Sequence, residues 1–235
     1  MDKKMKHLIV GYGQIGQSVH KVLGDAVWVS KSNSGTYTPT KDKIDVVHIC
    51  FPYTDKFKFY GEVADYQQIA PLVIVHSTVA VGVCDTLGVV HSFVTGKHPH
   101  LEEGIRTFVK YFGGKQADQA AKIFEDLGIK TKVYQYAGIT EAMKLISTTY
   151  YGLNIMIEKE IYAWCQRKNL PFEEVYSENN RGYNEGYLKL GNPEFVRPNL
   201  KHIEGKIGGH CVINNLELID DFWLADLLKK ENEKY

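Results

Sequence analysis

Apolar residues form short runs in the first 135 residues, and polar stretches and glycines separate these runs. The runs lie at residues 7–10, 26–30, 45–51 and 72–76, with shorter candidates at 89–91 and 132–134. Between several of them the apolar positions take a helical spacing, as in residues 116–127, which end just before Gly128. Strands that alternate with helices in this way predict a doubly wound, mostly parallel sheet, with its ligand beyond the carboxyl ends of the strands.

The pattern changes after about residue 137. No proline interrupts residues 137–170, and the apolar residues keep a helical period, which predicts one long helix over residues 140–168. Residues 177–206 are rich in Asn, Gly, Pro and Tyr. They are either a disordered linker or a functional loop, and their position just before the Gly-Gly-His-Cys segment favours the loop. Residues 216–230 read as a closing amphipathic helix. The long helix exceeds the core of one small domain, so a homodimer interface is expected along it.

The first apolar run leads directly into a glycine-rich motif, Gly11-Tyr12-Gly13-Gln14-Ile15-Gly16. In a G-x-G-x-x-G motif between a strand and a helix, the first glycine allows the tight turn and the second lets a pyrophosphate approach the backbone. The third glycine lets helix and strand pack closely. The motif predicts dinucleotide binding, and the alternative is a tight structural turn. We therefore expect an α/β fold with a Rossmann-like domain at residues 1–135 and a smaller all-α domain at residues 136–235.

The end of the second predicted strand bears on the choice of dinucleotide. Sites for an unphosphorylated ribose usually carry Asp or Glu there, whereas this strand runs into Ser30, Lys31 and Ser32. A cation and two hydroxyls suit a 2′-phosphate better than a free hydroxyl, so the cofactor is NAD or NADP with NADP favoured. The alternative is a solvated turn.

Composition narrows the classes of partner. The chain has 235 residues, 44% of them hydrophobic, and its 28 basic residues balance 28 acidic ones. The chain therefore has no net charge that would attract nucleic acid or a membrane surface. Only three strongly apolar residues in a row precede Gly11, too few for a signal peptide or a membrane span. The four scattered cysteines fit a reducing cytoplasm, where we expect the protein.

One of these cysteines has an unusual setting, because two adjacent glycines lead into His210 and Cys211. The segment IGGHC follows Arg197 by a short interval, and the predicted long helix carries Glu141 and Lys144 as E-x-x-K, with Glu160 beyond. Together these features resemble the nucleotide-sugar 6-dehydrogenases, which act on UDP-glucose, UDP-N-acetylmannosamine or GDP-mannose. The N-terminal half is similar too. There, Phe51 and Pro52 match the family's proline loop, and Ser77 and Thr78 match its Ser-Thr turn.

The resemblance implies a chemistry for these residues. Cys211 would attack an aldehyde intermediate to give a thiohemiacetal, which a second hydride transfer converts to a thioester, while Lys144 steadies the oxyanion. A sugar-like small molecule is the implied substrate, with Arg197 and His210 at its site. Phe51, Pro52 and Ser77 are implied cofactor contacts, and Thr78 joins the catalytic set. Without the resemblance, Cys211 reads as a small buried residue in a glycine turn, and Lys144 as part of a solvated helix face.

The sequence also departs from the family. Asn215 stands where the family has an aspartate, and an amide cannot take a proton from water. Thr148 replaces an asparagine, and Val94 falls near the expected place of a glutamate. The chain stops at Tyr235, which suggests a short form without the family's third, nucleotide-sugar-binding domain.

The loop at residues 96–104 concentrates charged and histidine side chains. Lys97 and His98 are candidate substrate contacts on an active-site rim, with His98 or His100 as a proton carrier. The alternatives are a solvated loop before a helix that starts near Leu101, and a metal site of His91, His98 and His100, although that spacing matches no recognised ligand pattern.

Three functions follow from these residues. The leading hypothesis is an NAD(P)-dependent oxidoreductase of a sugar-like or nucleotide-linked alcohol or aldehyde. The second is a degenerate, non-catalytic homologue that binds a nucleotide or a partner. The third is a simpler two-electron dehydrogenase that uses Lys144 with a histidine and leaves Cys211 idle.

Overall fold

A computed structural model describes residues 5–30, 35–37, 43–208 and 212–235. The chain divides into two compact units, Met1–Leu145 and Ile146–Tyr235. The division falls inside the long helix α6 (Ala137–Lys168), whereas the boundary expected from the sequence, between residues 135 and 136, lies just before the start of that helix.

The described residues of unit 1 form a seven-stranded sheet in the order β2-β1-β3-β4-β5-β6-β7. The strands are β1 (His7–Val10), β2 (Ala26–Val29), β3 (Val46–Ile49), β4 (Leu72–Val75), β5 (Val90–His91), β6 (Lys110–Gly113) and β7 (Thr131–Tyr134). Every neighbouring pair is parallel except β5 and β6. The predicted doubly wound, mostly parallel sheet is therefore confirmed. Strand β6 was not predicted, because a lysine begins it and two glycines close it, which hides its apolar pattern.

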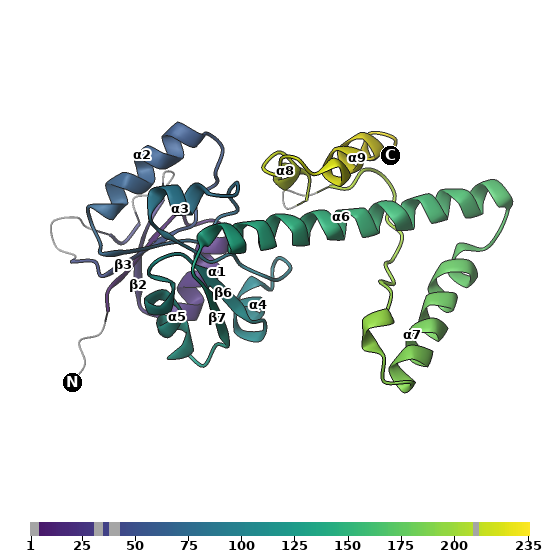
Figure 1. Ribbon diagram of the computed structural model, residues 1–235, viewed down its shortest axis with the longest axis horizontal. Helices are drawn as coiled ribbons and strands as arrows, with labels where there is room; N and C mark the ends of the chain where they lie inside the picture. Colours follow the sequence, from purple (N-terminus) through teal and green to yellow (C-terminus); the bar gives the residue numbers. More distant parts are fainter. Residues whose placement is uncertain (1–4, 31–34, 38–42, 209–211) are drawn as a thin grey trace. The chain divides into compact units, whose positions relative to one another are not determined.

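Helices cover both faces of this sheet (Figure 1). One face packs against α1 (Gln14–Leu23), α4 (Leu101–Thr107) and α5 (Ala117–Glu125). The other packs against α2 (Lys56–Gln67) and α3 (Val83–Leu87). Strands β1, β3 and β4 are buried at every position, as expected for parallel strands covered on both sides.

The elements of unit 2 are helical in its described residues. The rest of α6 is followed by the π-helix η1 (Glu173–Glu178), α7 (Asn179–Lys189), the short 3₁₀-helix η2 (Pro193–Phe195), α8 (Ile213–Leu216) and α9 (Trp223–Asn232). The predicted long helix and all-α C-terminal part are confirmed, and Figure 1 shows α6 as the longest element of the chain. In the part of the chain that the structure describes, no helix combines the length and apolar character that crossing a membrane requires.

Two expectations for unit 2 were wrong. The stretch at residues 177–206 is not all loop, since α7 occupies its first third. Its many Asn and Gly residues have low helix propensity, but tertiary contacts override this, because Asn184 binds the backbone of Arg197 through both its amide atoms. The closing helix begins at Trp223 rather than near residue 216, because α8 ends at Leu216 and the left-handed conformation of Asp221, with φ 50°, does not fit a helix.

Candidate functional site

The turn between β1 and α1 uses its glycines in different ways. Gly11 has φ +90°, and a Cβ on it would lie 2.7 Å from the backbone nitrogen of Phe51. A Cβ on Gly16 would lie 2.0 Å from the carbonyl oxygen of Gly11, so helix and strand touch here backbone to backbone. At Gly13, by contrast, no described atom lies within 4 Å of such a Cβ, and its φ of −77° suits any residue. Gly13 therefore faces open space at the head of α1.

The first turn of α1 is suited to an anion. Gln14 and Ile15 begin the helix, no side chain caps its first turn, and that turn carries no acidic residue. The leading N–H groups and the positive end of the helix dipole thus meet no negative side chain within this turn. Beside the turn, the ring of Tyr12 stacks on Trp28 of β2, with ring centroids 4.0 Å apart. Ser30 directly follows β2, and Lys31 lies outside the described residues.

The carboxyl ends of β3 and β4 lie next to this turn in the sheet. Phe51 and Pro52 come shortly after β3, and Ser77 and Thr78 come shortly after β4. The Ser77 hydroxyl donates to the Phe51 carbonyl at 2.6 Å, which ties the two ends together. Because β1 lies between β2 and β3, the strand order reverses here, at the point where open α/β sheets bind their ligands.

A buried histidine connects this edge to α6. His91 Nε2 lies 3.2 Å from the Ser77 carbonyl, and Nδ1 lies 2.8 Å from the Thr140 hydroxyl. A carbonyl only accepts, so Nε2–H donates to Ser77, and Nδ1 of the neutral ring faces the Thr140 hydroxyl, which also lies 2.9 Å from the Ala137 carbonyl. Burial lowers the pKa of His91 to about 3, so the ring is neutral. Because both ring nitrogens are engaged and His98 and His100 are exposed, these contacts give no support to a metal site of the three histidines.

Helices α3 and α6 cap each other. The Asp85 carboxylate of α3 accepts from the backbone N–H groups of Ala137 and Gly138, each at 2.9 Å. In return, the buried Glu141 carboxylate of α6 accepts from Gly82 N at 2.6 Å and Cys84 N at 2.8 Å. Burial raises the pKa of Glu141, and these N–H donors oppose the rise. The glutamate of E-x-x-K therefore fixes the first turns of α6 in unit 1.

Lys144 lies one turn after Glu141 and is half-buried. Its Nζ donates to the carbonyl oxygen of Val94 at 3.2 Å and lies 5.9 Å from the centre of the Phe93 ring. Val94 is the residue that the resemblance placed near a glutamate, and its backbone carbonyl is one hydrogen-bond partner of the lysine.

Two further candidates meet inside unit 2. The Asn215 amide donates from Nδ2 to the Thr148 hydroxyl at 3.2 Å, and Asn215 is buried. Two of the candidate residues from the sequence thus contact each other directly.

The remaining candidates are dispersed. Lys97 and His98 are exposed in the loop before α4 of unit 1. Arg197 of unit 2 is exposed too, and its guanidinium stacks on the Tyr183 ring at 3.4 Å. His210 and Cys211 lie outside the described residues. The three other cysteines are free and buried; they are Cys50, Cys84 and Cys165.

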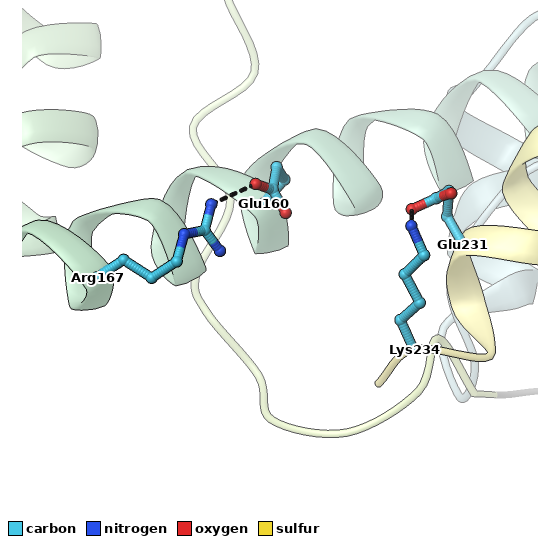
Figure 2. Close-up of polar contacts among 4 residues, drawn as sticks. All are labelled: Glu160, Arg167, Glu231 and Lys234. Carbon is cyan, nitrogen blue, oxygen red and sulfur yellow. Dashed lines mark hydrogen bonds and ion pairs between the residues drawn. The ribbon is translucent and has the colours of Figure 1, made fainter.

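Unit 2 also contains a cavity of about 600 Å³ lined by residues of α6, η1, α7 and the segment at 197–198. Trp164 and Arg197 are among the lining residues, as is Glu160. Figure 2 shows Glu160 paired with Arg167 at 2.7 Å, and Glu231 paired with Lys234. Glu160, the later glutamate of the resemblance, therefore forms an exposed ion pair on α6.

Sequence reasoning missed the polar residues that hold the site. Asp85, Thr140 and the capping role of Glu141 give no periodic signal, because each acts on a backbone distant in sequence. His91 closes a short apolar run, which indicates burial but not its hydrogen-bond partners.

Comparisons with known proteins identify the fold. No protein-family model matches the chain, and no curated protein sequence matches it either. Among solved structures, a UDP-D-ManNAc dehydrogenase from Pyrococcus horikoshii matches 98% of this chain and 68% of its own, with TM-score 0.76 and 17% identity. A 3-hydroxyisobutyrate dehydrogenase from Mycobacterium tuberculosis matches 99% of this chain and 94% of its own, with TM-score 0.71 and 15% identity. A GDP-mannose dehydrogenase from Pseudomonas aeruginosa matches 98% and 69%, with TM-score 0.64 and 16% identity. The chain therefore has the fold of these dehydrogenases.

Proposed function

We propose that the protein is an NAD(P)-dependent oxidoreductase that interconverts an alcohol and a carbonyl group on a small, sugar-like or nucleotide-linked substrate. The observation that carries this proposal is the open space at Gly13, at the head of an uncapped helix and at the switch point of the sheet. A pyrophosphate needs such a place, where backbone N–H groups and the helix dipole can meet it without a side chain between.

The residues around the turn fit a dinucleotide. The backbone of the motif from Gly11 to Gly16 would hold the pyrophosphate, and Phe51, Pro52 and Ser77 would contact its nicotinamide half. Ser30 and Lys31 would face the adenosine ribose, which favours NADP over NAD. When bound, the nicotinamide supplies the hydride acceptor or donor.

Lys144 is the proposed catalytic cation, with Thr78 beside the nicotinamide half. An ammonium group at the substrate oxygen stabilises the negative charge that develops there, and it gives or takes the proton as the carbonyl and hydroxyl interconvert. The Val94 carbonyl limits the positions that Nζ can take, and this preorganises the charge.

Cys211 extends this reaction to an aldehyde in the proposal. Its thiolate would bond to the aldehyde carbon and give a thiohemiacetal once the oxygen takes up a proton, and Lys97, His98, Arg197 and His210 are proposed as substrate contacts. Asn215 donates to Thr148 and cannot act as the base for hydrolysis of a thioester. We therefore expect turnover to stop after a single hydride transfer, with acid formation slow or absent.

A second candidate is a two-electron dehydrogenase of a hydroxyacid in which Cys211 is idle. The match to a 3-hydroxyisobutyrate dehydrogenase, which covers 94% of that chain, favours it. The two candidates differ in substrate and in their use of the thiol. Cys211→Ser should abolish any acid formation by the first candidate and spare its alcohol–aldehyde interconversion, and it should leave the second unchanged.

Turnover with a panel of substrates tests both candidates. The purified protein is given NAD⁺ or NADP⁺ with UDP-N-acetylmannosamine, GDP-mannose or 3-hydroxyisobutyrate, and reduced nicotinamide is measured by absorbance. Reduction with a sugar nucleotide supports the first candidate, and reduction with the hydroxyacid alone supports the second. Coenzyme binding without turnover on a wider set of alcohols would favour the non-catalytic homologue that Asn215 suggests.

The thiols should differ in reactivity. We expect iodoacetamide to alkylate Cys211 near neutral pH before the other three, and coenzyme or substrate to protect it. Burial raises the pKa of the Cys50 and Cys84 thiols, and Cys165 is fully buried, so these three are poor nucleophiles. Peptide mass mapping over time measures the order. Slower labelling of Cys211 than of the buried thiols would remove its nucleophilic role.

A homodimer is also part of the proposal. Tyr150, Ile157 and Trp164 of α6 are 62%, 52% and 43% exposed, and the last two line the cavity of unit 2. A second copy of α6 would remove this apolar surface from water. Light scattering should give the mass of a dimer at micromolar concentration, and a monomeric mass there would contradict the proposal.

A further inference from the structure

Side chains hold the backbone carbonyls of the segment that follows β5, while the Ser92 N–H still donates to Val75 of β4 at 2.8 Å. The Ser92 carbonyl accepts from His76 Nδ1 at 2.7 Å and from Lys110 Nζ at 3.3 Å. The Phe93 carbonyl accepts from the same Lys110 Nζ at 3.2 Å. Lys110 and His76 therefore satisfy two consecutive buried carbonyls that the short strand leaves behind.

The next carbonyl in this segment is the anchor of Lys144. Val94 O accepts from Lys144 Nζ at 3.2 Å, and the Phe93 ring lies 5.9 Å from the same Nζ. Residues 92–94 thus connect two lysines, with Lys110 of β6 at one end and Lys144 of α6 at the other. A movement of the first two carbonyls would also displace the third.

Lys110 is an unusual residue for this position. It is 4% exposed, and its Nζ lies 5.4 Å and 5.1 Å from the Phe112 and Phe124 ring centres. Among the described residues no carboxylate forms an ion pair with it. Burial lowers the pKa of Lys110 to about 7. Burial of a charged amine among these rings costs folding free energy. The neutral amine has two N–H donors, and these match the two carbonyls.

A row of histidines supports the same carbonyl from the sheet. Because the Ser92 carbonyl only accepts, His76 Nδ1 must donate, and its Nε2 accepts from His48 Nδ1 at 3.0 Å. His48 Nε2 in turn accepts from His7 Nδ1 at 3.1 Å. Burial, above all, lowers the pKa of His48 and His76 well below the usual value, so these two rings are neutral. Each ring fixes the tautomer of the next, and the row ends on Ser92.

We infer that Lys110 is a positioning residue for Lys144, which acts by holding the Ser92 and Phe93 carbonyls so that the Val94 carbonyl meets the Lys144 ammonium. The catalytic part of this inference rests on the proposed function, but the positioning part does not. Small displacements of a group in contact with substrate cost large factors in rate, so a buried side chain that sets this geometry is part of the active site's support.

The test compares two variants of the same segment. Lys110→Met keeps the length and apolar stem but removes both hydrogen bonds. Ser92→Ala is the matched control, because the Ser92 hydroxyl is buried with no hydrogen-bond partner in the described structure and its carbonyl remains. The ¹⁵Nζ and ¹³Cε NMR signals of Lys144, assigned by their loss in Lys144→Arg, report its environment without any need for turnover.

We expect Lys110→Met to shift the Lys144 signals and to lower kcat by roughly 10- to 100-fold, with coenzyme affinity unchanged. Ser92→Ala should leave all three at the wild-type values. Lys110→Met also removes the cost of a buried amine, so its melting temperature at pH 7 should not fall far below that of the wild type.

A second variant keeps the inference testable if Lys110→Met does not fold. His76→Leu removes the other donor to Ser92, and it should shift the Lys144 signals as Lys110→Met does. Shifted signals in a protein with no turnover would support positioning while the proposed function fails. Wild-type Lys144 signals in whichever of the two variants is folded would overturn the inference.

Discussion

Gly13→Asp should abolish the binding of NADH and NADPH while the protein stays folded. The new side chain enters open space, since no described atom lies within 4 Å of a Cβ at this position and the backbone is unstrained. Its carboxylate would stand where the pyrophosphate must approach. Like charges in contact cost several kcal/mol, so affinity should fall by about 100-fold or more. Fluorescence titration measures the loss, and circular dichroism checks the fold.

Two matched variants separate charge from packing at the same turn. Gly13→Ala should fold normally and weaken coenzyme binding less than Gly13→Asp. Gly16→Ala should instead destabilise the fold by roughly 1–3 kcal/mol or more, because its Cβ would lie 2.0 Å from the Gly11 carbonyl oxygen. Wild-type affinity in Gly13→Asp would remove the cofactor assignment.

Lys144→Met should lower kcat by roughly 10²- to 10⁴-fold, the usual contribution of a positioned acid or base. Coenzyme affinity should not change, because the lysine contacts the Val94 carbonyl rather than the glycine turn. Lys115→Met is the control, since Lys115 is exposed and has no place in the proposed site. Steady-state kinetics on the substrate found in the panel provide the measurement. Equal kcat in the two variants would show that Lys144 takes no part in the chemistry.

The sequence was most informative where a local pattern determines the structure. The glycine motif needed only its strand before and its helix after, and each of its glycines has a physical role in a single turn. The length of α6 was also predictable, because residues 137–170 contain no proline and keep a helical spacing of apolar residues.

The residues that hold the site in place could not be predicted from local sequence patterns. His48 and His76 lie within or next to apolar runs and look like satisfied core residues, and nothing local indicates that their rings form a row. Lys110 made β6 look polar, although its side chain is buried. The contact between Lys144 and Val94 joins residues 50 positions apart, so only the folded chain reveals it.

Coenzyme binding by the unmodified protein tests the oxidoreductase proposal without any knowledge of the substrate. Purified protein is titrated into NADPH and NADH, and the nicotinamide fluorescence is followed together with a parallel titration of Gly13→Asp. We expect saturable binding of at least one coenzyme, tighter for NADPH, and no detectable binding by the variant. If neither coenzyme binds the wild-type protein, the glycine turn is only a structural turn and the oxidoreductase proposal is wrong.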